Sequence, residues 1–173
     1  MQEKSNNIVL VGPMGSGKTT VGRRLAGNLK VDFYDADHEI INKTGVSIDH
    51  IFDLEGEEGF RKRESKALIE LCNKSNIVLA TGGGAVILEE NRLTIKKARS
   101  VIYLSSSIDQ ILRRTAKSKT RPLLENSSNR RQTISNIINT RDPLYRDVAT
   151  IIINTNGKKL NEIIKEILTH LPQ

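Results

Sequence analysis

The stretch IVLVGPMGSGKTT, residues 8–20, decides the fold of this chain. Four apolar residues lead into a loop with the spacing G-x-x-x-x-G-K-T, and a helical pattern follows the loop. A buried strand, a glycine-rich loop and a helix in this order form the context in which backbone amides wrap around phosphate groups. The stretch therefore predicts a phosphate-binding loop. The alternative is a chance glycine turn before a helix.

Each part of this loop suits the binding of Mg-ATP. Glycines allow consecutive backbone N–H groups to point at phosphate oxygens, and the following helix adds its positive N-terminal end. Lys18 would supply a charge to the β and γ phosphates, and the Thr19 hydroxyl would be a Mg²⁺ ligand. The ATP-binding residues predicted in this segment are Gly12, Gly15, Ser16, Gly17, Lys18, Thr19 and Thr20.

The rest of the chain alternates short apolar runs with amphipathic patterns. Runs typical of buried strands lie at residues 33–34, 77–80, 101–104 and 151–153. Helical patterns lie at residues 19–29, 59–73, 108–117, 131–140 and 160–171. Strand alternating with helix predicts an α/β, three-layer P-loop fold with a central parallel sheet of about five strands flanked by helices. The polar, proline-interrupted segment at 117–129 predicts a mobile loop.

Net charge alone does not choose among the possible partners. The 173 residues suit one domain, and a formal net charge of +7 suits nucleic acid, an anionic membrane or small anionic ligands. Only 3% of the residues are aromatic, so the chain has few side chains that could stack on the bases of single-stranded nucleic acid. No apolar run approaches the ~20 residues that cross a bilayer, and no signal-peptide core is seen. We therefore expect a cytoplasmic protein without nucleic-acid or membrane partners.

Cysteine and histidine indicate no separate site. Cys72 lies in an apolar row of a predicted helix, which favours a structural role over a reactive thiol. The three histidines, His38, His50 and His170, lack the spacing of metal ligands. We expect all four side chains to be structural or exposed.

Two carboxylates, Asp35 and Asp37, follow the apolar run at residues 33–34. Ligands of open α/β sheets bind at the carboxyl ends of the strands, where these side chains would lie. One carboxylate could hold Mg²⁺ through water while the other orients a substrate hydroxyl or accepts its proton. The alternative is that either aspartate caps the helix that follows.

Four further motifs occur along the chain: GEEGFRKRE at residues 56–64, TGGGA at 81–85, TRPLL at 120–124 and LYR at 144–146. With the phosphate loop and the two aspartates, their order and spacing resemble the shikimate kinase family over essentially the whole chain. The resemblance implies a single kinase domain, residues 1–173, with a substrate-binding insertion at about 35–65 and a lid at about 117–129. We expect this domain to be a monomer.

The same resemblance implies the reaction. A shikimate kinase transfers the γ-phosphoryl group of ATP to the 3-hydroxyl of shikimate, giving shikimate 3-phosphate and ADP in the chorismate pathway to the aromatic amino acids. One Mg²⁺ per active site is the implied cofactor. The partners are then ATP and shikimate.

The resemblance also assigns substrate-binding residues: Asp37, Arg61, Gly82, Gly83, Gly84 and Arg146. Arg61 and Arg146 would bind the carboxylate of shikimate, since a guanidinium matches a carboxylate in paired hydrogen bonds. Asp37 would contact the hydroxyl that becomes phosphorylated. In isolation, Arg61 reads as a solvated helix charge and Arg146 as a surface ion pair with Asp142 or Asp147.

The family's lid brings an arginine to the transferring phosphoryl group, a role that would fall on Arg121. The implied catalytic residues are then Lys18, Asp37 and Arg121. Residues 78–81 contain no aspartate, so Thr19 and Asp35 are the implied metal residues, the latter through water.

The residues that would contact the adenine base are assigned less completely. Arg114 would lie along the base and join Arg121 among the ATP-binding residues, but the adjacent Arg113 leaves this choice open. The loop at 154–158 corresponds to the family's adenine-side loop without a residue-by-residue assignment. Phe52 and Phe60 could line the substrate ring or belong to the core.

Two other functions remain open at this point. Gluconate and nucleoside-monophosphate kinases share the phosphate loop, although a pair of arginines favours a carboxylate acceptor. A nucleotide-dependent binding protein or a basic RNA-binding module would use the positive charge without catalysis.

Overall fold

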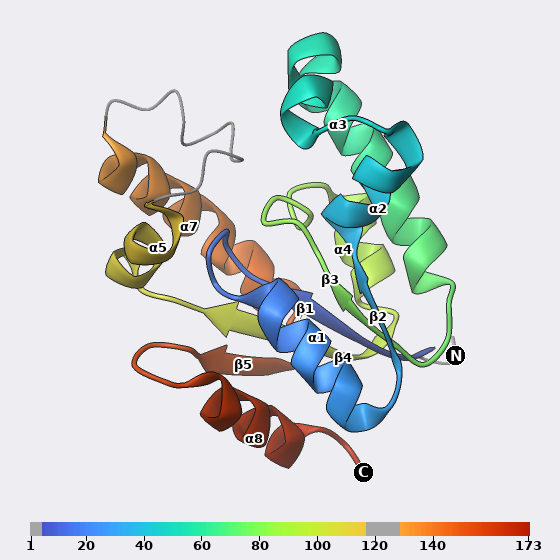
Figure 1. Cartoon of the computed structure of the whole chain (residues 1–173), viewed down its shortest axis with the longest axis vertical. Helices are drawn as coiled ribbons and strands as arrows, with labels where there is room; N and C mark the ends of the chain where they lie inside the picture. Colours follow the sequence, from blue (N-terminus) through green and yellow to red (C-terminus); the bar gives the residue numbers. More distant parts are fainter. Residues whose placement is uncertain (1–4, 117–128) are drawn as a thin grey trace.

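The structure is a computed structural model, and it describes residues 5–116 and 129–173. Its centre is a parallel sheet with the strand order β2-β3-β1-β4-β5 (Figure 1). The strands are β1 (Ser5–Val11), β2 (Asp32–Asp35), β3 (Ile77–Ala80), β4 (Ala98–Ser105) and β5 (Ile151–Asn154). The five-stranded parallel sheet predicted from the sequence is therefore confirmed.

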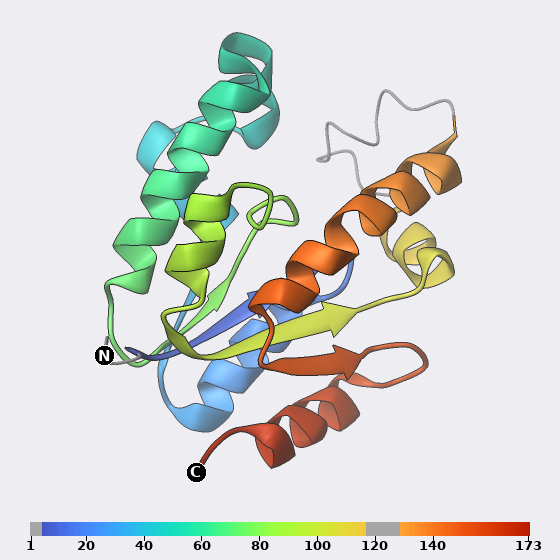
Figure 2. The ribbon, with the colours of Figure 1, turned by 180° about the vertical axis from the view of Figure 1, so that it is seen from behind.

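Helices cover both faces of this sheet. They are α1 (Lys18–Leu29), α2 (Ala36–Thr44), α3 (Ile48–Cys72), α4 (Glu89–Ile95), α5 (Ile108–Thr115), α7 (Arg130–Val148) and α8 (Leu160–His170). Figure 2, seen from behind, shows α7 in front of the strands, whereas α1 lies in front of them in Figure 1. This arrangement makes the three layers that the sequence pattern predicts. Within the described ranges, none of the helices is long and apolar enough to cross a membrane.

Side-chain alternation along β1 explains why there is a buried cluster on each face of the sheet. Val9 and Val11 pack into one buried cluster with residues of α3, α4 and α7. Ile8 and Leu10 pack into a second cluster with residues of α1 and α8. Because successive strand residues point to opposite faces, a strand in the middle of the sheet must be apolar at every position.

Several helices differ from the prediction. The helices α2 and α4 were not predicted, and α3 begins eleven residues before the expected position 59, which follows from its start at Ile48. Its first part is separated from the rest by Gly56, with φ 70° and ψ −177°, a conformation that favours glycine. The helix α3 therefore consists of two helical segments joined by a kink at Gly56, and a single periodicity does not run through both.

The helix α7 continues to Val148 rather than ending at residue 140, and Pro143 lies inside it. An internal proline costs a helix about 3 kcal/mol. Burial of Tyr145 and Val148 in the core offsets this cost, since a buried large apolar side chain contributes about 1.5–3 kcal/mol. Asn129, placed at the end of the lid by the sequence, caps this helix by accepting a hydrogen bond from the Gln132 amide at 3.1 Å. Residues 117–128, the rest of the predicted lid, lie outside the described residues.

Candidate active site

The phosphate loop connects β1 to α1 and is closed by its own lysine. The Lys18 ammonium donates to the carbonyl oxygens of Gly12 at 2.7 Å and Pro13 at 2.9 Å. Gly12, Gly15 and Gly17 all have positive φ, and a side chain on Gly12 would begin 2.6 Å from the Leu104 carbonyl oxygen. The glycines are therefore required by the backbone path that turns the amides inward.

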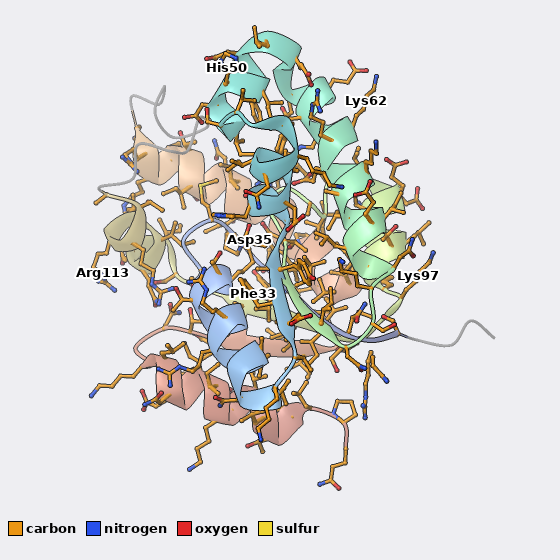
Figure 3. The ribbon with its side chains drawn as sticks, turned by 45° about the vertical axis from the view of Figure 1, so that its right-hand side comes forward. Phe33, Asp35, His50, Lys62, Lys97 and Arg113 are labelled. Carbon is orange, nitrogen blue, oxygen red and sulfur yellow. The ribbon has the colours of Figure 1, made fainter. Side chains whose placement is uncertain are left out.

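Arg114, on α5, contacts this loop. Its guanidinium donates to the Gly15 carbonyl oxygen at 3.0 Å. Burial, together with the charge of Arg113, lowers the pKa of Arg114. Arg113, labelled in Figure 3, and Arg114 are both exposed on α5, and the contact with Gly15 is made by Arg114. Of the two arginines that the sequence left open, the structure brings Arg114 to the loop.

A cavity of about 220 Å³ lies against the loop. Its lining includes residues from α1, β2, α5 and the segment after β3: Gly15, Gly17, Lys18, Thr19, Thr20, Asp35, Asp37, Thr81, Gly82, Gly83 and Arg114. The side-chain hydroxyl of Ser16 is buried next to it and has no hydrogen-bond partner among the described atoms. The phosphate loop thus offers amide, ammonium, guanidinium and hydroxyl groups to an anion.

Asp35, at the end of β2 in Figure 3, has two partners. One carboxylate oxygen accepts from the His38 amide at 3.1 Å and so caps α2, while the other accepts from the Thr19 hydroxyl at 2.6 Å. Asp35 therefore caps α2 and also lies beside the phosphate loop. A hydroxyl and a carboxylate are hard oxygen donors, which fits Mg²⁺. No group of three or more His, Cys, Asp or Glu side chains suited to a metal occurs in the described part of the chain.

A second cavity, of about 320 Å³, lies between α2, α3, α7 and the glycine segment after β3. Met14, Ile41, Ile48, Phe52 and Phe60 are its apolar lining, and Asp37, Ser47, Asp49, Arg61, Glu64, Gly82, Gly83, Gly84 and Arg141 complete it. The rings of Phe52 and Phe60 have centroids 4.8 Å apart. An apolar wall with a few convergent charges is typical of a site for a small polar molecule.

Arg61 is 8% exposed and is held within this cavity by two carboxylates. Its guanidinium donates to Glu64 at 2.8 Å and to Glu57 at 3.3 Å. A side chain on Gly84 would collide with the guanidinium, so glycine at this position makes room for Arg61. Burial raises the pKa of Glu64, and the nearby charge of Arg61 opposes that rise. This arginine is buried and oriented, unlike a solvated helix charge.

The second arginine of the cavity is Arg141, which the sequence reading did not select. Arg141 is 7% exposed and lines the cavity from α7. The side chain of Arg146 is 55% exposed, pairs with Asp142 at 2.8 Å and is not part of the lining. The structure therefore places Arg146 in the surface ion pair that was its alternative reading. Helical periodicity could have found Arg141, because it lies one turn before the buried Tyr145 on the same face.

Asp37, Gly82 and Gly83 line both cavities. The carboxylate of Asp37 is close to the glycine segment, since a side chain on Gly82 would begin 3.0 Å from its Oδ1 atom. Figures 1 and 2 show α3 and α7 on either side of this segment. An anion in the phosphate loop and a molecule between the two arginines would meet at Asp37.

The family model for shikimate kinase matches residues 14–172. The chain belongs to the shikimate kinase family. The shikimate kinase of Thioalkalivibrio sulfidiphilus is 47% identical over 164 residues, covering 95% of this chain and 86% of the relative. That of Francisella tularensis subsp. novicida is 46% identical over 169 residues, covering 97% and 96%. The resemblance that the motifs indicated is therefore confirmed.

A solved structure supports the same family at the level of the fold. The shikimate kinase from Acinetobacter baumannii in complex with shikimate superimposes with a TM-score of 0.92 at 47% identity, covering 96% of this chain and 93% of that one. The shikimate kinase from Aquifex aeolicus is 36% identical with a TM-score of 0.81. The α/β, three-layer P-loop fold predicted from the sequence is thus shared with solved shikimate kinases.

The predicted adenine-side loop, residues 154–158, lines neither cavity. Arg121 lies outside the described residues. The adenine-side loop follows β5, and the Asn156 side chain accepts from the Ser107 amide at 2.8 Å, just before the start of α5. That contact places the loop beside the helix that carries Arg114. His38 is exposed, and its amide, not its ring, takes part in the capping contact.

Proposed function

We propose that this chain transfers the γ-phosphoryl group of ATP to the 3-hydroxyl of shikimate, giving shikimate 3-phosphate and ADP. The observation that supports this best is the common wall of the two cavities at Asp37, Gly82 and Gly83. Phosphoryl transfer needs the attacking hydroxyl in line with the phosphate, so the two substrates must bind in adjacent sites. The family membership supplies the identity of the acceptor.

Arg61 and Arg141 would bind the carboxylate of shikimate. Both are buried in the cavity of about 320 Å³, which would be the acceptor cavity. A charge-assisted hydrogen bond to a carboxylate is stronger there than on the surface. This pair replaces the Arg61 and Arg146 pair expected from the sequence, because Arg146 lies on the surface beside Asp142. The phenylalanines at 52 and 60 would contact the carbon ring.

Asp37 would orient the substrate hydroxyl at the boundary of the two cavities and accept its proton as the bond to phosphorus forms. The backbone of the glycine segment 82–84 would contact the same substrate. Because glycines have no side chains, the amides of this segment can approach a ligand closely.

On the nucleotide side, Lys18 and the loop amides would hold the phosphates, with Ser16, Thr20 and the glycines at 12, 15 and 17 completing the cradle. Lys18 would leave the Gly12 and Pro13 carbonyls to contact the β and γ phosphates. Arg114 would lie along the base, and Arg121 would stabilise the transferring phosphoryl group. One Mg²⁺, held by Thr19 and by Asp35 through water, would neutralise phosphate charge.

The test is ADP release with Mg-ATP in the presence and absence of shikimate. D-gluconate and nucleoside monophosphates serve as competing acceptors, and Lys18→Ala serves as the control without phosphate binding. We expect release that depends on shikimate and disappears in the control. Turnover with one of the other acceptors instead, or none with any, would contradict the proposal.

Two further expectations remain predictions: a monomeric state and a cytoplasmic location. Sedimentation of the purified chain at several concentrations tests the first. Fractionation of cells that express it tests the second.

A further inference from the structure

Tyr145 connects the core to the acceptor cavity. It lies in the last turns of α7, is 1% exposed, and packs in the buried cluster of Val9, Val11 and Tyr103. Its hydroxyl donates to the Gly83 carbonyl oxygen at 2.6 Å. Gly83 is one of the residues that line both cavities. A core side chain therefore holds the segment where the two substrates would meet.

Arg141 lies one helical turn before Tyr145 on α7. The Arg141 guanidinium lies close enough to the Tyr145 side chain to lower its pKa. Its Nη1 atom is 3.7 Å from the position where a side chain on Gly83 would begin. Burial raises the pKa of Tyr145 to about 12, and the charge of Arg141 opposes that rise. The hydroxyl thus keeps its proton at any pH at which the enzyme would be assayed.

Packing alone does not require this hydroxyl. A phenylalanine would fill the same space and keep the contact with the Tyr103 ring, whose centroid is 5.0 Å away. The hydroxyl additionally orients the Gly83 carbonyl and, through the shared peptide plane, the Gly84 N–H. The Gly83 carbonyl and the Gly84 N–H share one trans peptide plane and point in opposite directions, so holding the carbonyl also directs that amide, in a residue of the acceptor cavity.

We infer that Tyr145 is a positioning residue for the acceptor: its hydroxyl holds the Gly83 peptide beside the Arg141 guanidinium, in one arrangement that receives the anionic substrate. This rests on the proposed function, in which Arg141 binds the carboxylate of shikimate. Tyr145 itself does not line the acceptor cavity, and it acts through its two neighbours. Preorganised binding groups lose less freedom when the ligand arrives, which lowers the KM of that ligand alone.

Tyr145→Phe tests the inference, and Tyr103→Phe is the matched control. Tyr103 is also buried, and its hydroxyl donates to Asp142 at 2.7 Å, on the side of the surface pair with Arg146. Both variants lose one hydroxyl and one hydrogen bond from neighbouring rings. We expect Tyr145→Phe to raise the KM for shikimate about five- to tenfold while the KM for ATP stays within twofold. We expect Tyr103→Phe to leave both constants within twofold.

A double-mutant cycle supplies the second readout. If the hydroxyl acts through Arg141, the effect of Tyr145→Phe on the shikimate KM should shrink in an Arg141→Ala background. Equal rises in the two KM values, no rise beyond that of Tyr103→Phe, or full additivity with Arg141→Ala would each overturn the inference. These outcomes leave the wild-type turnover of shikimate intact, whereas failure of the proposed function would appear as no shikimate-dependent ADP release by the wild type.

Discussion

Two arginines five positions apart on α7 have opposite environments. Arg141 is buried in the acceptor cavity, whereas Arg146 reaches solvent and pairs with Asp142. We expect Arg141→Ala to raise the KM for shikimate at least tenfold, since a hydrogen bond to a charged group contributes about 1.5–3 kcal/mol. Arg146→Ala should change it less than twofold, because exposed ion pairs contribute little. Steady-state kinetics of both variants decide which arginine binds the shikimate carboxylate. A larger rise in KM for Arg146→Ala than for Arg141→Ala would assign that role to Arg146.

Glu64 gives the site a dependence on pH. Burial raises its pKa, Asp37 adds to the rise, and Arg61 and Arg141 oppose it. A carboxyl whose pKa is higher in the folded state stabilises the fold below its unfolded pKa of about 4.3, and this stability is lost as pH rises through the folded pKa. Glu64→Gln should remove that loss. In urea unfolding from pH 4 to 8, the stability of wild type relative to the variant should fall as pH rises, and parallel profiles would refute the assignment.

At the scale of an element, α1 contains two glycines with different surroundings. A side chain on Gly22 would begin 2.6 Å from the Phe33 ring and 2.9 Å from a Leu10 methyl group, whereas nothing lies within 4 Å of one on Gly27. Gly22→Ala should therefore destabilise the fold by about 1–3 kcal/mol through overpacking. Gly27→Ala should stabilise it by about 0.5–1 kcal/mol through helix propensity. Chemical denaturation of the two variants measures this, and a stabilising Gly22→Ala would disprove the close packing of α1 on the sheet.

At the scale of the whole molecule, the two cavities touch but differ in their need for metal. The proposed Mg²⁺ residues, Thr19 and Asp35, line the phosphate cavity and not the acceptor cavity. EDTA should abolish shikimate-dependent ADP release, and added Mg²⁺ should restore it. Shikimate at 100 times its Kd should still raise the Tm in EDTA, because binding to the folded state alone stabilises it by about 2.7 kcal/mol. Loss of that shift without metal would mean that the acceptor site depends on the ion.

The sequence by itself determined the parallel sheet, the phosphate loop and the family. Their signals are local: apolar runs for buried strands, and the fixed spacing of Gly12, Lys18 and Thr19. Arg61 also followed from the family motif, and the structure places it in the acceptor cavity.

Only the tertiary structure decided which arginine of α7 faces the cavity and where that helix ends. Pro143 is a local signal for termination, and burial of Tyr145 and Val148 in the core overrides it. Once the helix continues, its 3.6-residue period places Arg141 on the face of Tyr145 and turns Arg146 toward solvent. Which side chain contacts a substrate depends on packing between segments that are distant in the sequence. Local sequence patterns do not predict that packing.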